Sequence, residues 1–528
     1  MATYASRSAW ELRTRTITSV RVAVPAGIGL LVALSLLLRT RQLGLGYWID
    51  EGLSVGIADR PLSGIPQALR MDGSPPLYYL LLHLWIGVFG PTEAATHALS
   101  LLFSTLAMPV AWWAARATFG PRAGWFAFGL AALNPFLTQY AQETRMYALV
   151  ALLGLPACAC FLRAFVFREG TAPRTRRPWI AGFAASLAAL SYTHNWALFF
   201  VAASVAAWLG LLRLAPPAER RELVRDGLLG FGGAFALYLP WLPTTLYQAT
   251  HTGAPWSRPP GIDDLLGVPG ALLGAIAQVV LLLTAGGGLL ALLARHQGRL
   301  GERGRAVLVL AVLGAGTITL AWIASQVNPA WANRYLVIGL APFLLICAAG
   351  LAANGRMGLI GLALVAALWI PDGPPNEKSN VRAVSHNVFP SLRPGDLVVA
   401  TQPEQVPVLH YYLPKGVKFA TLTGAVKDVG VTDWRDGVPR LEATTPEHDL
   451  APLLDALPAG ARLVLVEPIT YNLDRWSAPW TQLIRIRSQE WRQFLSNDPR
   501  FEITAVQPSS FTPPRPNPVR ATVLVKTA

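Results

Sequence analysis

The feature that most constrains this chain is a series of apolar segments that recur along its first 370 residues. A segment of roughly 20 apolar residues is long enough to cross a bilayer as a helix, which satisfies its backbone hydrogen bonds internally. The series therefore predicts an α-helical polytopic membrane protein with about 11 transmembrane helices. The segments lie near residues 22–38, 98–115, 124–140, 146–166, 179–193, 195–212, 227–247, 268–294, 306–326, 335–353 and 357–370.

Composition supports this class and divides the chain in two. Of the 528 residues, 53% are hydrophobic and only 14% are charged, which is too little charge for a soluble protein of this size. Residues 1–371 contain 27 arginines, no lysine and 14 acidic residues, whereas residues 372–528 contain all five lysines and a nearly balanced 17 basic and 16 acidic residues. We expect a transmembrane module over 1–371, with an outer loop at 39–97, and a soluble domain over 372–528.

The arginines predict the orientation, because cytoplasmic loops collect basic residues. If the segment Pro75–Gly90 is a juxtamembrane helix and not a span, the clusters at 163–177, 213–225 and 295–305 all lie on the side of the basic N-terminus. We therefore expect a cell-membrane protein with an uncleaved first span, a cytoplasmic N-terminus and an extracytoplasmic C-terminal domain. The excess of basic residues is then explained by the orientation of the protein in the membrane, and no nucleic-acid partner is expected.

The C-terminal part alternates turn signals with short runs rich in β-formers, as in Pro394–Ala400 and Ala459–Val466. This pattern is typical of a small α/β domain. It contains neither a G-x-G-x-x-G motif nor a P-loop, so no nucleotide is assigned to it. This domain has three open roles: it covers the outer cleft, it holds an acceptor, or it acts only as a structural cap.

Adjacent carboxylates stand in the hexapeptide Tyr47-Trp-Ile-Asp-Glu-Gly52, shortly after the first apolar segment. Asp50 and Glu51 are expensive to hold where a span leaves the bilayer, so an acid/base or ion site is one interpretation. A hydrated loop end is the other. With the predicted topology, further polar residues of the chain gather on the same outer side.

Arginine recurs at two further outer positions. Glu143 and Arg145 stand in the stretch Gln142–Tyr147 between two spans, and Arg334-Tyr335 begins another span. The planar guanidinium binds phosphate oxygens in pairs and stays charged at low dielectric, so both arginines are candidate phosphate ligands. The alternatives are an interfacial ion pair for the first and a snorkelling arginine beside a belt tyrosine for the second.

His194 and the tryptophans near span ends have open roles. His194 lies between two spans and could ligate a metal, shuttle protons or make a hydrogen bond in an interface. No cluster of histidines and carboxylates at metal-binding spacing can be read from the sequence, so the metal is unknown and a divalent cation stays open. Trp256 and Trp331 fit either an aromatic belt or sugar stacking, and the three cysteines stand in apolar runs that favour packing.

Four stretches in order resemble a known family. They are Tyr47–Ser54, Ser74–Trp85, Gln142–Leu149 and Asn333–Leu336, and they are similar to predicted membrane-bound mannosyltransferases of the GT-C fold. These are relatives of the protein O-mannosyltransferases and of the aminoarabinose transferase. The match covers about the first 390 residues. It departs at Ser74, where members often have histidine, and at His97, where they often have arginine.

The resemblance implies an inverting glycosyltransferase that moves a mannose-like sugar or a pentose from a polyprenyl-phosphate carrier to an acceptor hydroxyl on a glycan, lipid or protein. Asp50 would act as the base, with Glu51 orienting the acceptor or tuning the pKa of Asp50. The carrier phosphate and the substrate would have separate contacts. We expect Arg145, Arg334, Tyr335, Lys378 and Arg382 at the phosphate, and Glu143, Tyr78, His194 and Trp256 at the substrate.

Two other classes fit a polytopic protein with charged residues. A lipid-linked-sugar transporter or flippase tends to have repeated halves and a site near the midplane. This chain has no internal repeat that we detect, and its charged motifs lie at span ends, which favours the enzyme. A non-catalytic scaffold that presents the external domain is the third class.

Overall fold

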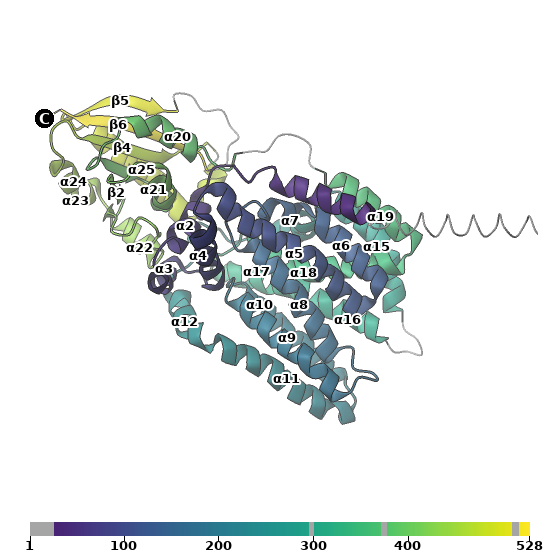
Figure 1. Cartoon of the computed structure of the whole chain (residues 1–528). Coiled ribbons are helices and arrows are strands. Elements are labelled where there is room, and N and C mark those ends of the chain that lie inside the picture. The colour runs from purple at the N-terminus through teal and green to yellow at the C-terminus, as the bar shows by residue number, and fades with distance from the viewer. Residues whose placement is uncertain (1–25, 295–299, 371–376, 472, 509–516, 528) are drawn as a thin grey trace, which may run out of the picture.

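The computed structural model describes residues 26–294, 300–370, 377–471, 473–508 and 517–527. These residues form a bundle of helices with a sheet-containing region at one end (Figure 1). The multi-span helical architecture and the mixed β-sheet in the C-terminal part confirm the predicted fold class at this level.

Five helical stretches of the described chain are long and apolar enough to cross a membrane. Shorter apolar helices and further helices accompany them. Each predicted apolar segment coincides with helices over its described residues, and residues 22–25 of the first segment lie outside the described part. The number of about 11 crossings stays a prediction. The five are α5 (Glu93–Phe119), α8 (Tyr147–Phe165), α10 (Ala197–Leu214), the continuous stretch Glu302–Val327 that contains α16 (Glu302–Ala311) and α17 (Thr317–Val327), and Asn333–Ala353 with α18 (Val337–Ala353). The shorter apolar helices are Ala26–Thr40, α4 (Leu77–Phe89), α15 (Ala277–Leu293) and α19 (Arg356–Leu368). The others are α6 (Pro121–Leu133), α7 (Pro135–Tyr140), α9 (Pro173–Ser191), α11 (Pro217–Tyr238), α12 (Leu242–His251), α13 (Ile262–Leu266) and α14 (Val268–Leu273).

Small residues and proline set how the bundle helices pack and break. A Cβ on Gly288 of α15 would collide with the carbonyl of Gly350 on α18, so these two helices approach backbone to backbone. Close approach through small residues is the usual way in which membrane helices associate. The chain breaks between α6 and α7 at Asn134, whose side chain accepts a hydrogen bond from the N–H of Leu137 and caps α7.

The segment between the first helix and α5 folds into three short helices at one end of the bundle. They are α2 (Ile49–Ala58), α3 (Ile65–Asp72) and α4. The carboxylates of Asp50 and Glu51 lie in the first turn of α2, where the helix dipole favours negative charge. The predicted outer loop is thus an ordered helical layer.

The C-terminal part contains one six-stranded mixed sheet in the order β3-β2-β1-β4-β6-β5. β1 pairs in parallel with β2 and β4, while β2–β3, β4–β6 and β6–β5 are antiparallel. The strands are β1 (Leu397–Ala400), β2 (Lys418–Thr421), β3 (Gly424–Ala425), β4 (Arg462–Pro468), β5 (Phe501–Gln507) and β6 (Val519–Lys526).

Alternate side chains of the central strands enter two different cores. Leu397 and Val399 of β1 belong to a core that also contains Trp491 of α25 (Pro479–Ser496). Val398 and Ala400 belong to the large core that continues into the helical bundle. β1 is therefore buried on both faces, as parallel strands usually are. The helices of this region are α20 (Val381–Val388), α21 (Val406–Tyr412), α22 (Gly437–Glu442), α23 (Pro446–Asp449), α24 (Ala451–Asp455) and α25.

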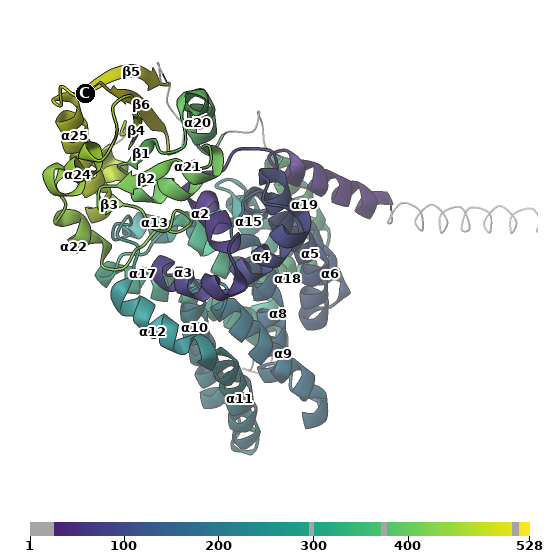
Figure 2. The same cartoon turned by 60° about the vertical axis from the view of Figure 1, so that its left-hand side comes forward.

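Helix α2 joins the bundle to the C-terminal region through two glycines. A Cβ at Gly52 would lie 2.5 Å from the Cβ of Val408 on α21, and a Cβ at Gly56 would lie 2.5 Å from the carbonyl oxygen of Gly430. Neither position has room for a larger residue without movement of the partner backbone. The helix that carries Asp50 is therefore fixed partly by the C-terminal region, and Figure 2 shows α2 beside α21.

Candidate active site

A cavity of about 420 Å³ lies at the junction of the bundle, α2, α3 and α12. One part of its wall is charged, with Asp50, Asp72, Arg145 and Arg334. Another part is apolar and comes from bundle helices, with residues such as Leu198, Phe199 and Ala324. The cavity can therefore accommodate a molecule that has both a charged group and an apolar portion.

Asp50 lies between two arginines in the charged part of this cavity. Its Oδ2 atom is 3.9 Å from Nε of Arg145 and 3.5 Å from Nε of Arg334. Among the described residues, this oxygen has no hydrogen-bond partner, and neither does either Nε. The site therefore brings together a carboxylate that can accept a proton and two guanidinium groups that can donate to an anion.

Arg145 is held by contacts on its other side. Its Nη1 donates to the Ser54 hydroxyl at 3.1 Å, to the Asp50 backbone carbonyl at 3.3 Å and to the Tyr79 hydroxyl at 3.5 Å. These partners belong to α2 and α4. The guanidinium is thus fixed in the wall of the cavity, with Nε on the side of the Asp50 carboxylate.

Arg334 is surrounded by aromatic rings. Its guanidinium carbon is 4.9 Å from the ring centre of Trp256, 5.3 Å from that of Tyr335 and 5.6 Å from that of Trp48. Such rings attract a cation through their negative faces. The side chain is 22% exposed, so it remains accessible from the cavity.

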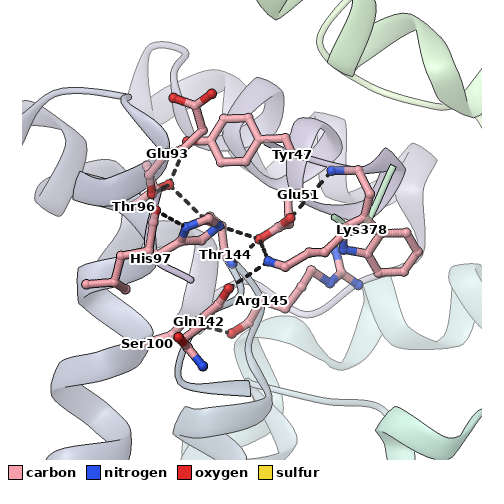
Figure 3. A network of polar contacts seen from close by, with 12 residues as sticks. Tyr47, Glu51, Glu93, Thr96, His97, Ser100, Gln142, Thr144, Arg145 and Lys378 are labelled. Carbon is pink, nitrogen blue, oxygen red and sulfur yellow. Dashed lines mark hydrogen bonds and ion pairs between the residues drawn. The ribbon is translucent and has the colours of Figure 1, made fainter. Parts of the chain in front are cut away.

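Glu51 takes part in a buried polar network (Figure 3). Its Oε1 atom accepts hydrogen bonds from Nε2 of His97 at 2.6 Å, Nζ of Lys378 at 2.8 Å and the backbone N–H of Thr144 at 2.9 Å. Lys378 also donates to the carbonyl of Gln142 at 2.6 Å. The Glu51 side chain is 0% exposed, so it does not reach the cavity.

The partners of Glu51 keep it ionised. Burial by itself would raise the pKa of Glu51, but the charge of Lys378 and the His97 imidazole outweigh burial and lower the pKa. Nδ1 of His97 lies 2.7 Å from the carbonyl of Leu43, so both ring nitrogens face acceptors.

Three other ionisable groups near the cavity have shifted pKa values. Burial raises the pKa of Asp72 to about 6, with Ser74 and Arg145 opposing the shift and Asp50 adding to it. Burial also raises the pKa of Glu143, and the charges of Glu51 and Asp50 add to this while Lys378 opposes it.

The third group is His194. Burial lowers its pKa to about 3, and the charges of Arg145 and Arg334 act in the same direction. Its Nδ1 accepts a hydrogen bond from the backbone N–H of Trp196 at 3.1 Å. The imidazole is therefore neutral at ordinary pH and available for a hydrogen bond or packing.

The predicted site residues fall into three groups. Those that line the cavity are Asp50, Arg145, His194, Trp256, Arg334 and Tyr335. Those that lie buried behind its wall or in the adjoining network are Glu51, Tyr78, Glu143 and Lys378. Arg382 lies apart from the cavity, where its Nη1 donates to the carbonyl of Gly44 at 2.9 Å and is 3.7 Å from Glu93.

Several cavity residues were not predicted from the sequence. Asp72 ends α3, directly before a glycine that adopts a left-handed conformation, and its sequence context reads as an ordinary turn. Behind the cavity wall, Tyr79 and not its predicted neighbour Tyr78 accepts a hydrogen bond from Arg145. Glu404 and Trp434 reach the cavity from the C-terminal region, and the only sequence signal for them was that this region could cover a cleft.

No group of three or more histidine, cysteine, aspartate or glutamate side chains that could hold a metal ion occurs within the part of the chain that the structure describes. Two of the cavity carboxylates, Asp50 and Asp72, are on different short helices. Binding of a divalent cation therefore stays an open prediction.

Comparison with known proteins gives matches at the level of the fold. No protein-family model matches the chain, and no curated protein matches it in sequence. The crystal structure of ArnT from Cupriavidus metallidurans bound to undecaprenyl phosphate is similar, with a TM-score of 0.61 and 12% identity, over 95% of this chain and 98% of that chain. Its apo state gives a TM-score of 0.62 with 13% identity over the same shares.

A second similar structure is the archaeal oligosaccharyltransferase AglB from Archaeoglobus fulgidus, in complex with an inhibitory peptide and a dolichol-phosphate. Its TM-score is 0.51 with 11% identity, over 82% of this chain and 69% of that chain. These neighbours are GT-C membrane glycosyltransferases. The chain therefore has the GT-C fold.

Proposed function

We propose that this protein is an inverting glycosyltransferase that moves a sugar from a polyprenyl-phosphate carrier to an acceptor hydroxyl. The observation that carries the proposal is the Asp50 carboxylate, which lies beside Arg145 and Arg334 in a cavity with an apolar wall. The similar structures are described in complex with undecaprenyl phosphate and with a dolichol-phosphate. The transferred sugar would be mannose-like or a pentose.

The carrier would bind in the 420 Å³ cavity. Its polyprenyl chain would lie along the apolar wall near Leu198 and Phe199, and its phosphate would lie near the two arginines. Guanidinium groups bind phosphate through paired charge-assisted hydrogen bonds. The unpartnered Nε atoms of Arg145 and Arg334 are donors that such a phosphate could engage.

In the reaction, Asp50 would remove the proton from the acceptor hydroxyl as its oxygen attacks C1 of the sugar. The C1–O bond to the phosphate would break on the opposite face, which inverts the anomeric centre. The leaving group is polyprenyl phosphate, whose added negative charge the two arginines would stabilise. The phosphate monoester leaves as an anion without protonation, so no second carboxylic acid is needed, in contrast to inverting glycosidases.

Glu51 and Lys378 would act as positioning residues. Their ion pair, with His97 and the Thr144 N–H, fixes the first turn of α2 against the loop before α8. This loop carries Arg145. The network would therefore hold the base and one phosphate ligand in a fixed relation, while Tyr78 and Glu143 would support the same wall from behind.

The proposed location is the cell membrane, with the cavity and the C-terminal region on the extracytoplasmic side. Arg382 would then help to join the C-terminal region to the loop near Gly44 and Glu93. On that side the acceptor would be part of a glycan, lipid or protein of the cell envelope.

The test is the variant Asp50→Asn, assayed in proteoliposomes with labelled polyprenyl-phosphate sugars. We expect release of polyprenyl phosphate to fall about 10²- to 10⁴-fold, the usual value of general base catalysis. Donor binding should be retained, because the substitution removes a negative charge beside Arg145 and Arg334. The matched control is Asp59→Asn, at the exposed end of the same helix; near wild-type release by Asp50→Asn would refute the assignment.

A further inference from the structure

A second cavity, of about 220 Å³, lies between the bundle and the C-terminal region. It meets the first cavity at Asp50, because both are lined by Asp50, Arg334, Trp256 and Glu404. A transferase needs two binding regions that converge on its base, one for the donor and one for the acceptor. The second cavity has this relation to the proposed donor cavity.

Aromatic side chains from distant parts of the sequence form much of this second cavity. Trp48 and Trp256 belong to the loops of the helical bundle, whereas Trp434, Tyr471 and Trp476 belong to the C-terminal region. Aromatic rings provide flat apolar faces, and tryptophan and tyrosine add a polar group at the edge. This combination suits a ligand that is itself flat and apolar on one face and polar around its rim.

Polar groups also line this cavity. Gln402 and Glu404 both line the cavity, and the Gln402 amide donates to the Glu404 carboxylate at 3.0 Å. The indole N–H of Trp480 also donates to that carboxylate, at 3.1 Å. Glu404 is thus held in one orientation by two donors, although it is only 5% exposed.

Three buried polar atoms of the cavity residues have no hydrogen-bond partner within the described ranges. They are the indole Nε1 of Trp48, Nε of Arg334 and Oδ2 of Asp50, of which the last two face each other as an ion pair at 3.5 Å. A buried donor or acceptor without a partner is costly, so such groups are rare outside binding sites. The Trp48 N–H and the Asp50 carboxylate thus offer one donor and one acceptor, which match the hydrogen-bonding capacity of a hydroxyl group.

We propose that this second cavity is the acceptor subsite and that it binds a neutral saccharide, whose ring stacks on the tryptophans and whose hydroxyl reaches Asp50. The inference rests on the proposed transferase function and names its acceptor class. The carboxylates of Asp50 and Glu404 disfavour an anionic acceptor, since Arg334 is the one cation among the lining residues of this cavity in the described chain. The polar groups that line this cavity disfavour binding of a lipid tail.

The experiment measures saccharide binding without any lipid donor. Detergent-solubilised full-length protein is applied to an array of neutral mono- to tetrasaccharides, and bound sugars are then titrated by tryptophan fluorescence. For Trp476→Ala we expect the Kd to rise about tenfold or more, as for a central aromatic contact. Trp476→Phe keeps an aromatic face and should lose less. The control is Leu473→Ala, an exposed residue of the same helical turn that does not line the cavity.

Activity separates this proposal from the one it rests on. With a bound sugar as acceptor, Trp476→Ala should raise KM for the saccharide and leave donor dependence and Tm unchanged. If the alanine variant does not fold, Trp476→Phe carries the test, with a smaller rise in KM. Donor cleavage without binding of any neutral saccharide, or transfer to a peptide or lipid that Trp476→Ala does not impair, would overturn the subsite and leave the transferase intact. Saccharide binding without transfer to any acceptor would instead overturn the transferase.

Discussion

Replacing Lys378 by methionine removes one partner of a buried ion pair. Nζ of Lys378 lies 2.8 Å from Oε1 of Glu51, whose side chain is 0% exposed. At this separation and an effective dielectric constant of about 20, the attraction is about 6 kcal/mol, most of which offsets the desolvation of the two charges. Breaking a buried pair by removal of one partner costs about 3–5 kcal/mol. His97 and the Thr144 N–H still donate to Glu51 in this variant. We therefore expect the free energy of unfolding to fall by about 3 kcal/mol.

The pH dependence of this loss follows from the pKa of Glu51. In the wild type that pKa is lowered by Lys378 and His97 against the effect of burial, so its stabilising contribution is present at neutral pH and is lost as the pH falls through the lowered pKa. In Lys378→Met, burial is less opposed and the pKa of Glu51 rises. The variant can then take up a proton at mildly acidic pH, so the difference in stability should be largest near pH 7–8 and smaller near pH 5.

The assay is thermal unfolding in detergent, followed by tryptophan fluorescence, on Lys378→Met, Glu51→Gln and the double variant. Removal of the stranded carboxylate should restore part of the loss, so the double variant should melt above Lys378→Met. Lys378→Arg keeps the charge and is the control. If the decrease in Tm of the double variant equals the sum of the decreases in the two single variants, the coupling is refuted. The idea that this pair holds α2 in position would then be refuted as well.

Three further outcomes are expected. Arg145→Lys keeps the charge but loses the planar fork of the guanidinium, so the donor KM should rise while the acceptor KM stays the same. Arg334→Lys should act in the same direction but more weakly. A defect in the acceptor KM alone would show that Arg145 does not bind the phosphate. Cysteines at the exposed positions Thr175 and His448 should react with impermeant reagents from opposite sides of the membrane, and reaction from one side would contradict the arginine-based topology. Burial raises the pKa of Glu143 above its unfolded value, so the stability of the wild type should fall as the pH rises from about 4 toward the raised pKa. In Glu143→Gln, the Tm from melting curves should depend less on pH over this range. An unchanged slope of Tm against pH would contradict this expectation.

The parts of the fold that could be predicted depend on local sequence. An apolar run of sufficient length forms a helix in a bilayer whatever its neighbours are, and the predicted segments coincide with helices. Three charged residues of the main cavity were also predicted, because carboxylates and arginines at the ends of apolar segments are rare and costly. Asp50, Arg145 and Arg334 were singled out on that ground, and they lie together.

What could not be predicted depends on contacts between distant residues. Lys378 was expected at the donor phosphate, yet it bonds to Glu51, which is 327 positions away. No local pattern distinguishes a lysine that binds a ligand from one that pairs with a buried carboxylate. Glu404 and Trp434 likewise acquire a place in the cavity wall only through the packing of the C-terminal region.

The C-terminal region is better explained as part of the site than as a detached cap. Its Val408 on α21 packs against Gly52 of α2, and its Gly430 packs against Gly56, with no space for a Cβ at either glycine. The Tyr412 hydroxyl accepts a hydrogen bond from the backbone N–H of Tyr47 at 2.8 Å. The same hydroxyl donates to Glu93 at the start of α5 at 2.9 Å. These contacts help to fix the position of α2, since a helix of ten residues is too short to hold its position alone. A cap would need only to cover the cavity, whereas this region also determines where the Asp50 carboxylate stands.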